Sequence, residues 1–294
     1  MSIWQAGGGW WKLVKVGGGQ PAPEPPPPTS TTLLNLHNLR FQSVLPYKDE
    51  NPTELTPLVT VGIIVINVVV WLFVQGAGAA EPLARSVCQL GLIPGEVLRT
   101  VPPGTAVPLG QGLQCVLTAD PNWWTLLTSM FMHGGWLHII GNMWFLWVFG
   151  NNIEDSMGHL RFVIFYLLCG VAAAVTQMAV DPSSRVPMVG ASGAISGVMG
   201  GYVLLYPRVR VHTFITLGFF LTTVTLPAYV ILGYWFLLQL LLGAATAVSR
   251  AQGGVAVWAH VGGFVLGLLL IKLFANSEYL ERRRGGMLIL PRDA

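Results

Sequence analysis

Residues 190–197, GASGAISG, open a long stretch without Asp or Glu that ends only at Glu278. Gly193 and Gly197 stand four residues apart, a spacing that places them on one helix face and lets a second helix approach closely. Ser192 lies at the start of this pattern. It is either a nucleophile or one more small residue at a helix contact, and the segments around it decide between the two.

The composition predicts an all-α polytopic membrane protein. The 294 residues are 53% hydrophobic and only 10% charged, with a mean hydropathy of +0.60, a balance unusual for a soluble domain. A helix needs about 20 mostly apolar residues to cross a bilayer. Six blocks approach that length and predict six transmembrane helices: 58–75, 136–150, 160–180, 190–206, 229–247 and 256–274. A further apolar stretch, 213–226, ends at Pro227 and is expected to lie against or dip into the bilayer.

The positions of Lys and Arg predict the orientation, because cytoplasmic flanks carry an excess of both. Positive charge is densest in the N-terminal tail, at Arg208 and Arg210 after the fourth block, and in the sequence ERRR at 281–284. Both termini are therefore expected in the cytoplasm. The net charge of +3 follows from this topology, and the absence of a concentrated basic patch argues against a nucleic-acid partner.

The chain divides into three predicted regions. Residues 1–57 are expected to form a flexible cytoplasmic tail, rich in Gly and Pro to about residue 32. Residues 58–275 form the six-helix domain, with a long first outer loop at about 76–135, and residues 276–294 form a basic cytoplasmic tail. We expect no cleavable signal peptide, because the first apolar block lies too far from the N-terminus.

The three cysteines leave one question open. Cys88 and Cys115 both fall in the first outer loop, where a disulfide and two free thiols fit the sequence equally well. Cys169 lies in the third block and is expected to fill core space.

Polar side chains inside apolar blocks are costly and tend to mark functional sites. His138 and Asn142 share a helix face in the second block, Ser192 opens the fourth, and His260 lies in the first turns of the sixth. With a cytoplasmic N-terminus these three blocks all run inward, so the polar residues share one layer near the outer face. Each has a structural alternative when taken alone: helix packing for Ser192, a hydrogen-bonded interior position for either histidine, and an interhelical contact for Asn142.

Together these residues predict acyl-transfer chemistry. A serine hydroxyl needs an adjacent base, and histidine is the usual one. The three blocks contain no carboxylate to orient His260, so the pattern predicts a Ser192–His260 dyad rather than a triad. Asn142, His138 and the Ser192 backbone N–H can stabilise an oxyanion. A soluble hydrolase is excluded because its G-x-S-x-G turn would require glycine at Ala194.

These motifs resemble those of the rhomboid intramembrane serine proteases, over about residues 124–270. GASG at 190–193 is similar to the family's nucleophile motif, and AHVGGFVLG at 259–267 to its sixth-helix motif. HGGWLHIIGN at 133–142 is similar to the second-helix signature. The resemblance implies a Ser192 nucleophile and a His260 base, with oxyanion roles for His138 and Asn142.

The resemblance also implies supporting and substrate roles. His133 is expected to be structural, and Glu154, in GNNIED at 150–155, to brace the inner end. Membrane-anchored proteins would be cut in or near a transmembrane segment through an acyl-enzyme, in a lipid bilayer and without a cofactor or metal. A bacterial inner membrane is the expected location, and the sequence does not indicate an oligomeric state. Glycines expected to support helix packing are Gly190, Gly193, Gly263 and Gly267.

The sequence departs from the family pattern in two places. Trp124 and Thr125 stand where many members have Trp-Arg, and Ser196 stands where some members stack a tyrosine on the catalytic histidine. His260 must therefore be oriented in another way, such as by a hydrogen bond. The competing function is a non-enzymatic protein, either a transporter or a rhomboid-like scaffold or chaperone that leaves Ser192 unused. A transporter is disfavoured because the chain shows no matched pair of broken helices.

Overall fold

The computed structural model describes residues 13–15, 44–217, 220–249 and 256–281. The label η marks short helices of other types: η2 is a π-helix, and η3 and η4 are 3₁₀-helices. The elements in chain order are β1 (Leu13–Lys15), β2 (Val44–Asp49), α1 (Leu58–Val69), η2 (Val70–Val74), η3 (Gly76–Gly78), α2 (Ala80–Leu90), α3 (Pro94–Val97), β3 (Ala106–Gly110), β4 (Leu113–Val116), α4 (Thr125–Thr128), η4 (Ser129–Phe131), α5 (Trp136–Met157), α6 (His159–Val180), α7 (Ser192–Leu205), β5 (Arg210–Leu217), β6 (Phe220–Pro227), α8 (Ala228–Ser249) and α9 (Val257–Phe274).

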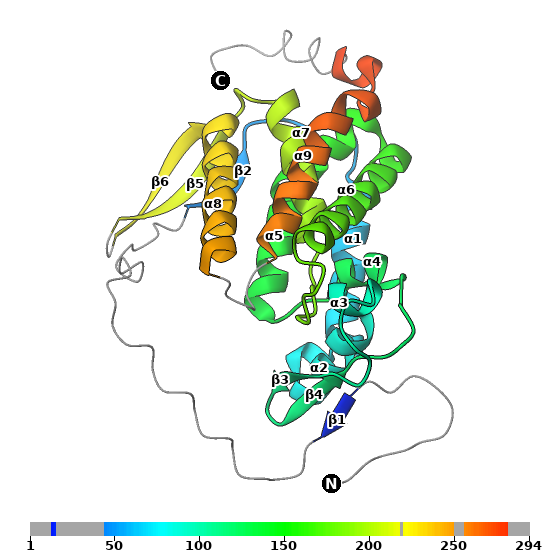
Figure 1. The fold of residues 1–294 in the computed structure, drawn as a ribbon. Helices are drawn as coiled ribbons and strands as arrows, with labels where there is room; N and C mark the ends of the chain where they lie inside the picture. Colours follow the sequence, from blue (N-terminus) through cyan, green and yellow to red (C-terminus); the bar gives the residue numbers. More distant parts are fainter. Residues whose placement is uncertain (1–12, 16–43, 218–219, 250–255, 282–294) are drawn as a thin grey trace.

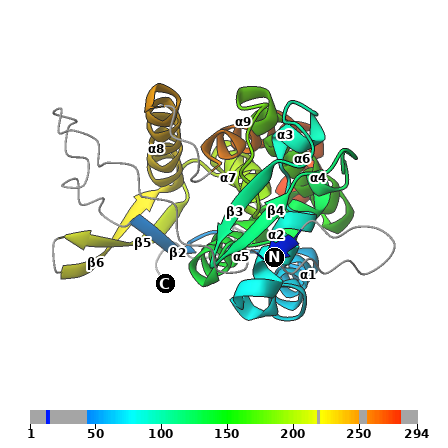
Figure 2. The ribbon, with the colours of Figure 1, turned by 60° about the horizontal axis from the view of Figure 1, so that its bottom comes forward.

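The fold is mostly helical. Helices α1, α5, α6, α7, α8 and α9 fall on the six predicted apolar blocks, whereas α2, α3 and α4 lie outside them. Within the described residues, α6, residues 228–245 of α8, and α9 are long and apolar enough to cross a membrane. Residues 58–74 and 192–205 form shorter apolar helices. Helices α5, α6, α7 and α9 pack together, with α7 in contact with the other three, and Figures 1 and 2 show α8 along one side of this group.

Helices α7 and α9 approach so closely that their backbones touch. A Cβ atom added to Gly263 would lie 2.0 Å from the carbonyl oxygen of Gly193, and one added to Gly267 would lie 2.0 Å from that of Gly197. Such close contact increases van der Waals packing, which drives helix association in a bilayer where the hydrophobic effect does not. This contact fixes the start of α7 beside the start of α9.

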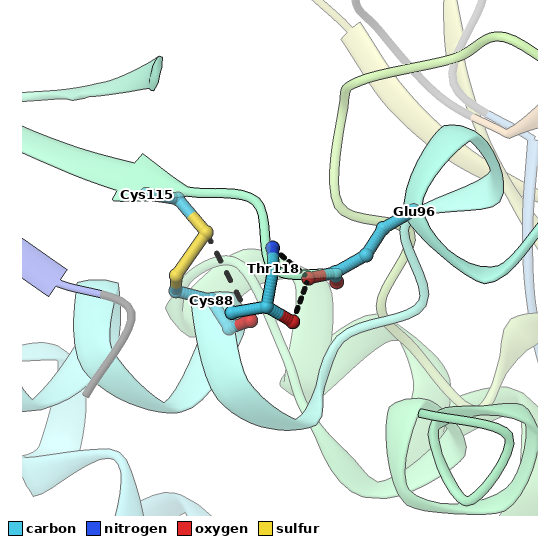
Figure 3. Close-up of a disulfide and its surroundings, with 4 residues drawn as sticks. All are labelled: Cys88, Glu96, Cys115 and Thr118. Atoms are coloured by element: carbon cyan, nitrogen blue, oxygen red, sulfur yellow. Dashed lines mark hydrogen bonds between the residues drawn. A yellow bond between two sulfur atoms is a disulfide. The ribbon is translucent and has the colours of Figure 1, made fainter. Parts of the chain in front are cut away.

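Residues 76–135, predicted to form the first outer loop, contain a small disulfide-linked subdomain built from α2, α3, β3 and β4. A Cys88–Cys115 disulfide joins α2 to β4, as Figure 3 shows, which decides the question that the sequence left open. The carboxylate of Glu96 accepts hydrogen bonds from the backbone N–H and the hydroxyl of Thr118, at 2.7 and 2.9 Å. Ile93 and Leu117 are buried beside the disulfide. The loop therefore has its own core.

A three-stranded antiparallel sheet, in the order β2–β5–β6, lies at one side of the bundle, next to α8 (Figure 1). The sequence analysis predicted no strand here: β5 and β6 occupy the apolar stretch 213–226, and β2 falls within the region assigned to a flexible tail. The Thr-, Val- and Phe-rich composition of 210–227 suits a pleated sheet. Buried Val211 and Thr213 alternate along β5. The six residues of β2 are too few to give a periodic signal of their own.

The position of strand β1 differs from the predicted topology. It pairs antiparallel with β4, with Leu13 opposite Cys115, and so lies at the disulfide end of the molecule, away from β2 (Figure 1). The sequence analysis expects all of residues 1–57 on the cytoplasmic side. Residues 16–43, which connect β1 to β2, lie outside the described residues and include Glu24 and Arg40. Among the described residues of the N-terminal region, β1 and β2 therefore lie in separate parts of the molecule, which the prediction of a single tail did not anticipate.

Candidate active site

Ser192 and His260 face each other across the α7–α9 contact. Ser192 is the first residue of α7, and His260 lies in the first turn of α9. The Ser192 Oγ is 2.7 Å from the His260 Nε2, within the range of an O–H···N hydrogen bond. His260 is buried, whereas Ser192 is partly exposed. The arrangement is that of a hydroxyl next to a base that can take its proton.

The other side of the His260 ring faces α8. Its Nδ1 lies 3.0 Å from the Gln239 Oε1, and the ring centroids of Trp235 and His260 are 5.8 Å apart with a tilt of 41°. Sequence reasoning missed both residues. Gln239 could have been found, because it is a strongly polar side chain within the apolar run LLQLLLG of the fifth block.

Ser196, which stands where some family members have a tyrosine, does not replace that tyrosine. Its hydroxyl donates a 2.6 Å hydrogen bond to the carbonyl oxygen of Ser192, four residues earlier in the same helix. Among the described residues, the contacts that orient His260 come instead from α8.

His138, Asn142 and Gly190 converge beside Ser192. A Cβ atom added to Gly190 would lie 2.7 Å from the His138 Nε2 and 3.6 Å from the Asn142 Nδ2. Gly190 has a φ of +126°, a conformation that other residues rarely adopt. Both nitrogens therefore point toward the backbone that leads into Ser192.

The hydrogen-bonding state of these two side chains suits donors. The backbone N–H of Gly134 donates to the His138 Nδ1 at 3.3 Å, so a neutral His138 carries its proton on Nε2. The buried Asn142 Nδ2 has no partner among the described residues. At the first turn of α7, backbone N–H groups also lack acceptors within the helix. These groups form a set of donors around one small volume.

His133 lies outside the helices and is fully buried. Its backbone N–H and carbonyl form a pair of 2.8 Å hydrogen bonds with the Gln75 amide, which ties the end of the first helix to the start of α5. Burial, assisted by the charge of neighbouring His138, lowers the pKa of His133 to about 3. The ring therefore stays neutral at physiological pH, in keeping with a structural position.

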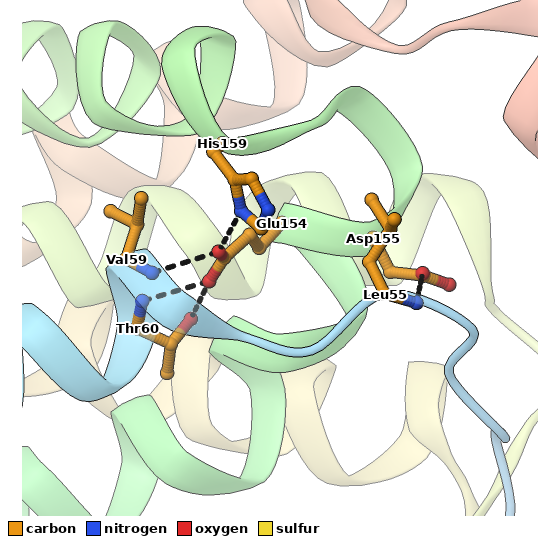
Figure 4. Close-up of polar contacts among 6 residues, drawn as sticks. All are labelled: Leu55, Val59, Thr60, Glu154, Asp155 and His159. Atoms are coloured by element: carbon orange, nitrogen blue, oxygen red, sulfur yellow. Dashed lines mark hydrogen bonds and ion pairs between the residues drawn. The ribbon is translucent and has the colours of Figure 1, made fainter.

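Glu154 lies in the last turn of α5, at the other end of that helix from His138, and Figure 4 shows the groups that contact it. Its buried carboxylate accepts hydrogen bonds from the backbone N–H groups of Val59 and Thr60, at 2.9 and 2.7 Å, and from the Thr60 hydroxyl at 2.6 Å. It also contacts the His159 ring. A carboxylate at a helix N-terminus satisfies N–H groups that have no acceptor within the helix. Glu154 thus joins α5 to α1.

A cavity of about 650 Å³ contains the candidate active site. Ser192, His260 and His138 line it, together with small residues such as Gly170, Ala173 and Ala259. A volume of this size accommodates a short peptide segment. Within the described part of the chain, no group of three or more His, Cys, Asp or Glu side chains is arranged to hold a metal ion.

Comparison with known proteins identifies the family. Residues 120–277 match the rhomboid domain model, which is more than half of the chain. The rhomboid protease GluP of Bacillus subtilis is 30% identical over 148 residues, which cover 50% of this chain and 26% of GluP. RHOMBOID-like protein 4 of Arabidopsis thaliana is 32% identical over 179 residues, covering 60% of this chain and 41% of that protein.

A third relative, the rhomboid protease AarA of Providencia stuartii, is 27% identical over 173 residues, which cover 53% of this chain and 57% of AarA. The matched region therefore spans about a quarter to just over half of the length of these relatives.

Proposed function

The chain belongs to the rhomboid family, and we propose that it is an intramembrane serine endopeptidase that uses a Ser192–His260 dyad. The observation that carries the proposal is the 2.7 Å contact between the Ser192 Oγ and the His260 Nε2, inside a cavity large enough for a peptide. The apolar helices and the family membership make the chain an integral membrane protein.

The proposed reaction begins with Ser192. Its Oγ attacks the carbonyl carbon of the scissile peptide bond, while the His260 Nε2 takes the hydroxyl proton. The tetrahedral intermediate then collapses, and His260 returns the proton to the leaving amine. A water molecule activated by His260 hydrolyses the resulting ester between Ser192 and the substrate, which regenerates the free hydroxyl.

The oxyanion of the tetrahedral intermediate requires hydrogen-bond donors. We assign this role to the Asn142 Nδ2, the His138 Nε2–H and the backbone N–H of Ser192, because these groups converge next to Gly190. Each such donor contributes roughly two to three orders of magnitude in rate in a preorganised site. None carries a net charge in the resting state, which limits the cost of burying the donors in a bilayer.

The proposed substrates are membrane-anchored proteins cut in or near a transmembrane segment. A helical peptide bond is shielded by its own hydrogen bonds, so the substrate must unwind locally before the Ser192 Oγ can reach it. Gly or Pro near the cleaved bond lowers the cost of unwinding. We therefore expect helix-breaking residues close to the cleavage position.

We propose that the disulfide end of the bundle faces the outside of the cell. Disulfides persist in oxidising compartments, and the subdomain that contains Cys88–Cys115 is hydrogen-bonded, through Leu92 and Met188, to the segment that leads into Ser192. Arg208, Arg210 and Lys272 then lie at the inner end, in accordance with the excess of positive charge on cytoplasmic flanks. A bacterial inner membrane stays a prediction, because the relatives come from both bacteria and a plant.

The test uses the full chain in detergent micelles, labelled with a fluorescent fluorophosphonate. The parent protein should be labelled, whereas Ser192→Ala and His260→Ala should not. A second measurement follows cleavage of a transmembrane reporter in proteoliposomes by mass spectrometry. A folded parent that neither labels nor cuts, beside an active rhomboid assayed in parallel, would favour the scaffold function.

A further inference from the structure

We propose that Gln239 on α8 is a positioning residue for His260: its side-chain amide accepts the Nδ1–H hydrogen bond and so holds the ring in the tautomer that leaves Nε2 free for Ser192. The inference rests on the proposed protease function and extends it to a residue outside the helices that carry the rhomboid-like motifs. The geometry consists of two contacts on one ring, Nε2 to the Ser192 Oγ at 2.7 Å and Nδ1 to the Gln239 Oε1 at 3.0 Å.

The hydrogen-bonding capacity of a neutral imidazole determines which tautomer these two contacts require. One ring nitrogen carries a proton and the other accepts one. A carbonyl oxygen such as Oε1 can only accept, so its contact with Nδ1 requires the proton to be there. Nε2 is then the acceptor, and the Ser192 hydroxyl is the donor. The opposite tautomer would place a proton between Nε2 and Oγ, and no base would be available to Ser192.

Helix α8 presents two side chains to the ring. Trp235 and Gln239 are four residues apart and therefore lie on the same helix face. The indole of Trp235 lies 5.8 Å from the His260 ring, and it also contacts Phe264, one turn further along α9. The aromatic contact restricts where the imidazole can sit, and the amide determines how it is rotated. This arrangement supplies the orientation that a third triad member would provide.

The proton balance of the proposed step is complete without a carboxylate. When Ser192 attacks, its proton moves to Nε2 and the ring becomes an imidazolium. Nδ1–H remains bonded to the Gln239 Oε1, and that bond strengthens because its donor is now charged. The proton then passes from Nε2 to the leaving amine, and the ring returns to its starting tautomer. Gln239 neither gains nor loses a proton.

An amide is suited to this position because the bilayer penalises charge. A carboxylate within a transmembrane helix is costly even when it is paired, and α7, α8 and α9 contain no Asp or Glu. An amide oxygen supplies an acceptor without a net charge. Among the described residues that line the cavity, His138 on α5 is the only ionisable side chain besides His260.

The test compares fluorophosphonate labelling rates of the full chain over a range of pH. Gln239→Met keeps the length of the side chain but removes the acceptor, and should label about 10- to 100-fold more slowly, the effect of losing a hydrogen bond to a charged group. Gln239→Glu restores the acceptor and should recover most of the rate. Its acid limb should also move to higher pH, because a carboxylate beside Nδ1 stabilises the imidazolium.

Gln177→Met is the matched control. It makes the same substitution on α6, at a glutamine whose side-chain Oε1 has no hydrogen-bond partner among the described residues, and should label at the parent rate. The inference is overturned if Gln239→Met labels as fast as the parent, or if Gln239→Glu is as slow as Gln239→Met with an unchanged pH profile. The second result would mean that the Gln239 side chain acts only by filling space. The unchanged pH profile of Gln239→Glu can be measured even if Gln239→Met is unstable, so the inference stays open to contradiction in that case.

The same experiment separates this inference from the proposed function. Absence of labelling in the parent, or equal labelling of the parent and Ser192→Ala, contradicts the protease proposal itself. Labelling that depends on Ser192 and His260 but not on Gln239 leaves the protease proposal in place and removes only the positioning role.

Discussion

The helix bundle holds two polar clusters, one around Glu154 at the end that we propose faces the cytoplasm (the inner end) and one around Ser192 at the end that we propose faces outside (the outer end). The two clusters differ in the groups that form their hydrogen bonds. At the inner end, Glu154 accepts from two backbone N–H groups and a hydroxyl, and Asp155 accepts from the backbone N–H groups of Glu54 and Leu55. At the outer end, the Asn142 Nδ2 has no partner within the described ranges.

The two ends also differ in charge. The inner cluster is built from carboxylates that accept hydrogen bonds from the start of α1 and from the residues just before it, so its contribution is to stability. The outer cluster consists of serine, histidine and amides, with donors left available around a cavity. Buried polar groups without partners are rare in folded proteins, and those that occur often mark functional sites. The contrast predicts that mutations will separate into those that affect activity and those that affect stability.

The largest expected effect is on activity and comes from Ser192→Ala. Cleavage of a transmembrane reporter should fall by at least about 10⁴-fold, because no other group replaces the nucleophile. The unfolding temperature should stay within a few degrees of the parent, since a partly exposed hydroxyl contributes little to packing. A mutant that unfolds readily while retaining activity would remove the distinction between the two ends.

Glu154→Ala tests the inner end and should act on stability. It leaves two backbone N–H groups and a hydroxyl without an acceptor in a buried place, at a cost of about 3–5 kcal/mol. The measurement is unfolding of the full chain in mixed micelles. Glu81→Ala is the control, because Glu81 is exposed and pairs with Arg85 on the same exposed helix face, and the change should be within about 0.5 kcal/mol. A similar loss in both variants would contradict the bracing role.

Asn142→Ala returns to the outer end with a smaller activity effect. Loss of one oxyanion donor should reduce the rate of cleavage by about 10²–10³-fold. Stability should not fall, because the Nδ2 has no partner in the described structure to lose. The check is a rate measurement beside a melting curve. A destabilised but fully active variant would assign Asn142 to helix packing.

The sequence was informative where one chemical requirement sets the pattern. Glycines at 193 and 263 predicted a close helix contact, and the structure places a virtual Cβ at Gly263 2.0 Å from a carbonyl oxygen of α7. The apolar blocks located the helices because a bilayer demands length and apolarity. The same reasoning brought Ser192, His138 and His260 into one layer, and the structure has all three lining one cavity.

The sequence was uninformative where long-range pairing decides. The six residues of β2 form a strand only because β5 lies next to them, more than 150 residues later. The choice between free thiols and a disulfide depended on how the outer loop folds, which spacing does not reveal. Gln239 was missed for a different reason. Its role depends on the distance between α8 and α9, and a single amide in an apolar run does not indicate its partner.

The smallest expected effect on activity comes from removing the Cys88–Cys115 disulfide. This change tests whether the outer cluster depends on the outer loop. The subdomain is connected to the chain just before Ser192, because Leu92 and Met188 exchange two backbone hydrogen bonds. Replacing Cys88 and Cys115 by serine opens a cross-link over 27 residues and should cost about 2–4 kcal/mol of stability. Cleavage by the fraction that stays folded should change less than about threefold, because the α7–α9 backbone contact, rather than the loop, sets the 2.7 Å distance between Ser192 and His260. A loss of activity much larger than the loss of folded protein would show that the active-site geometry requires the subdomain, and the outer cluster would then be less self-contained than the inner one.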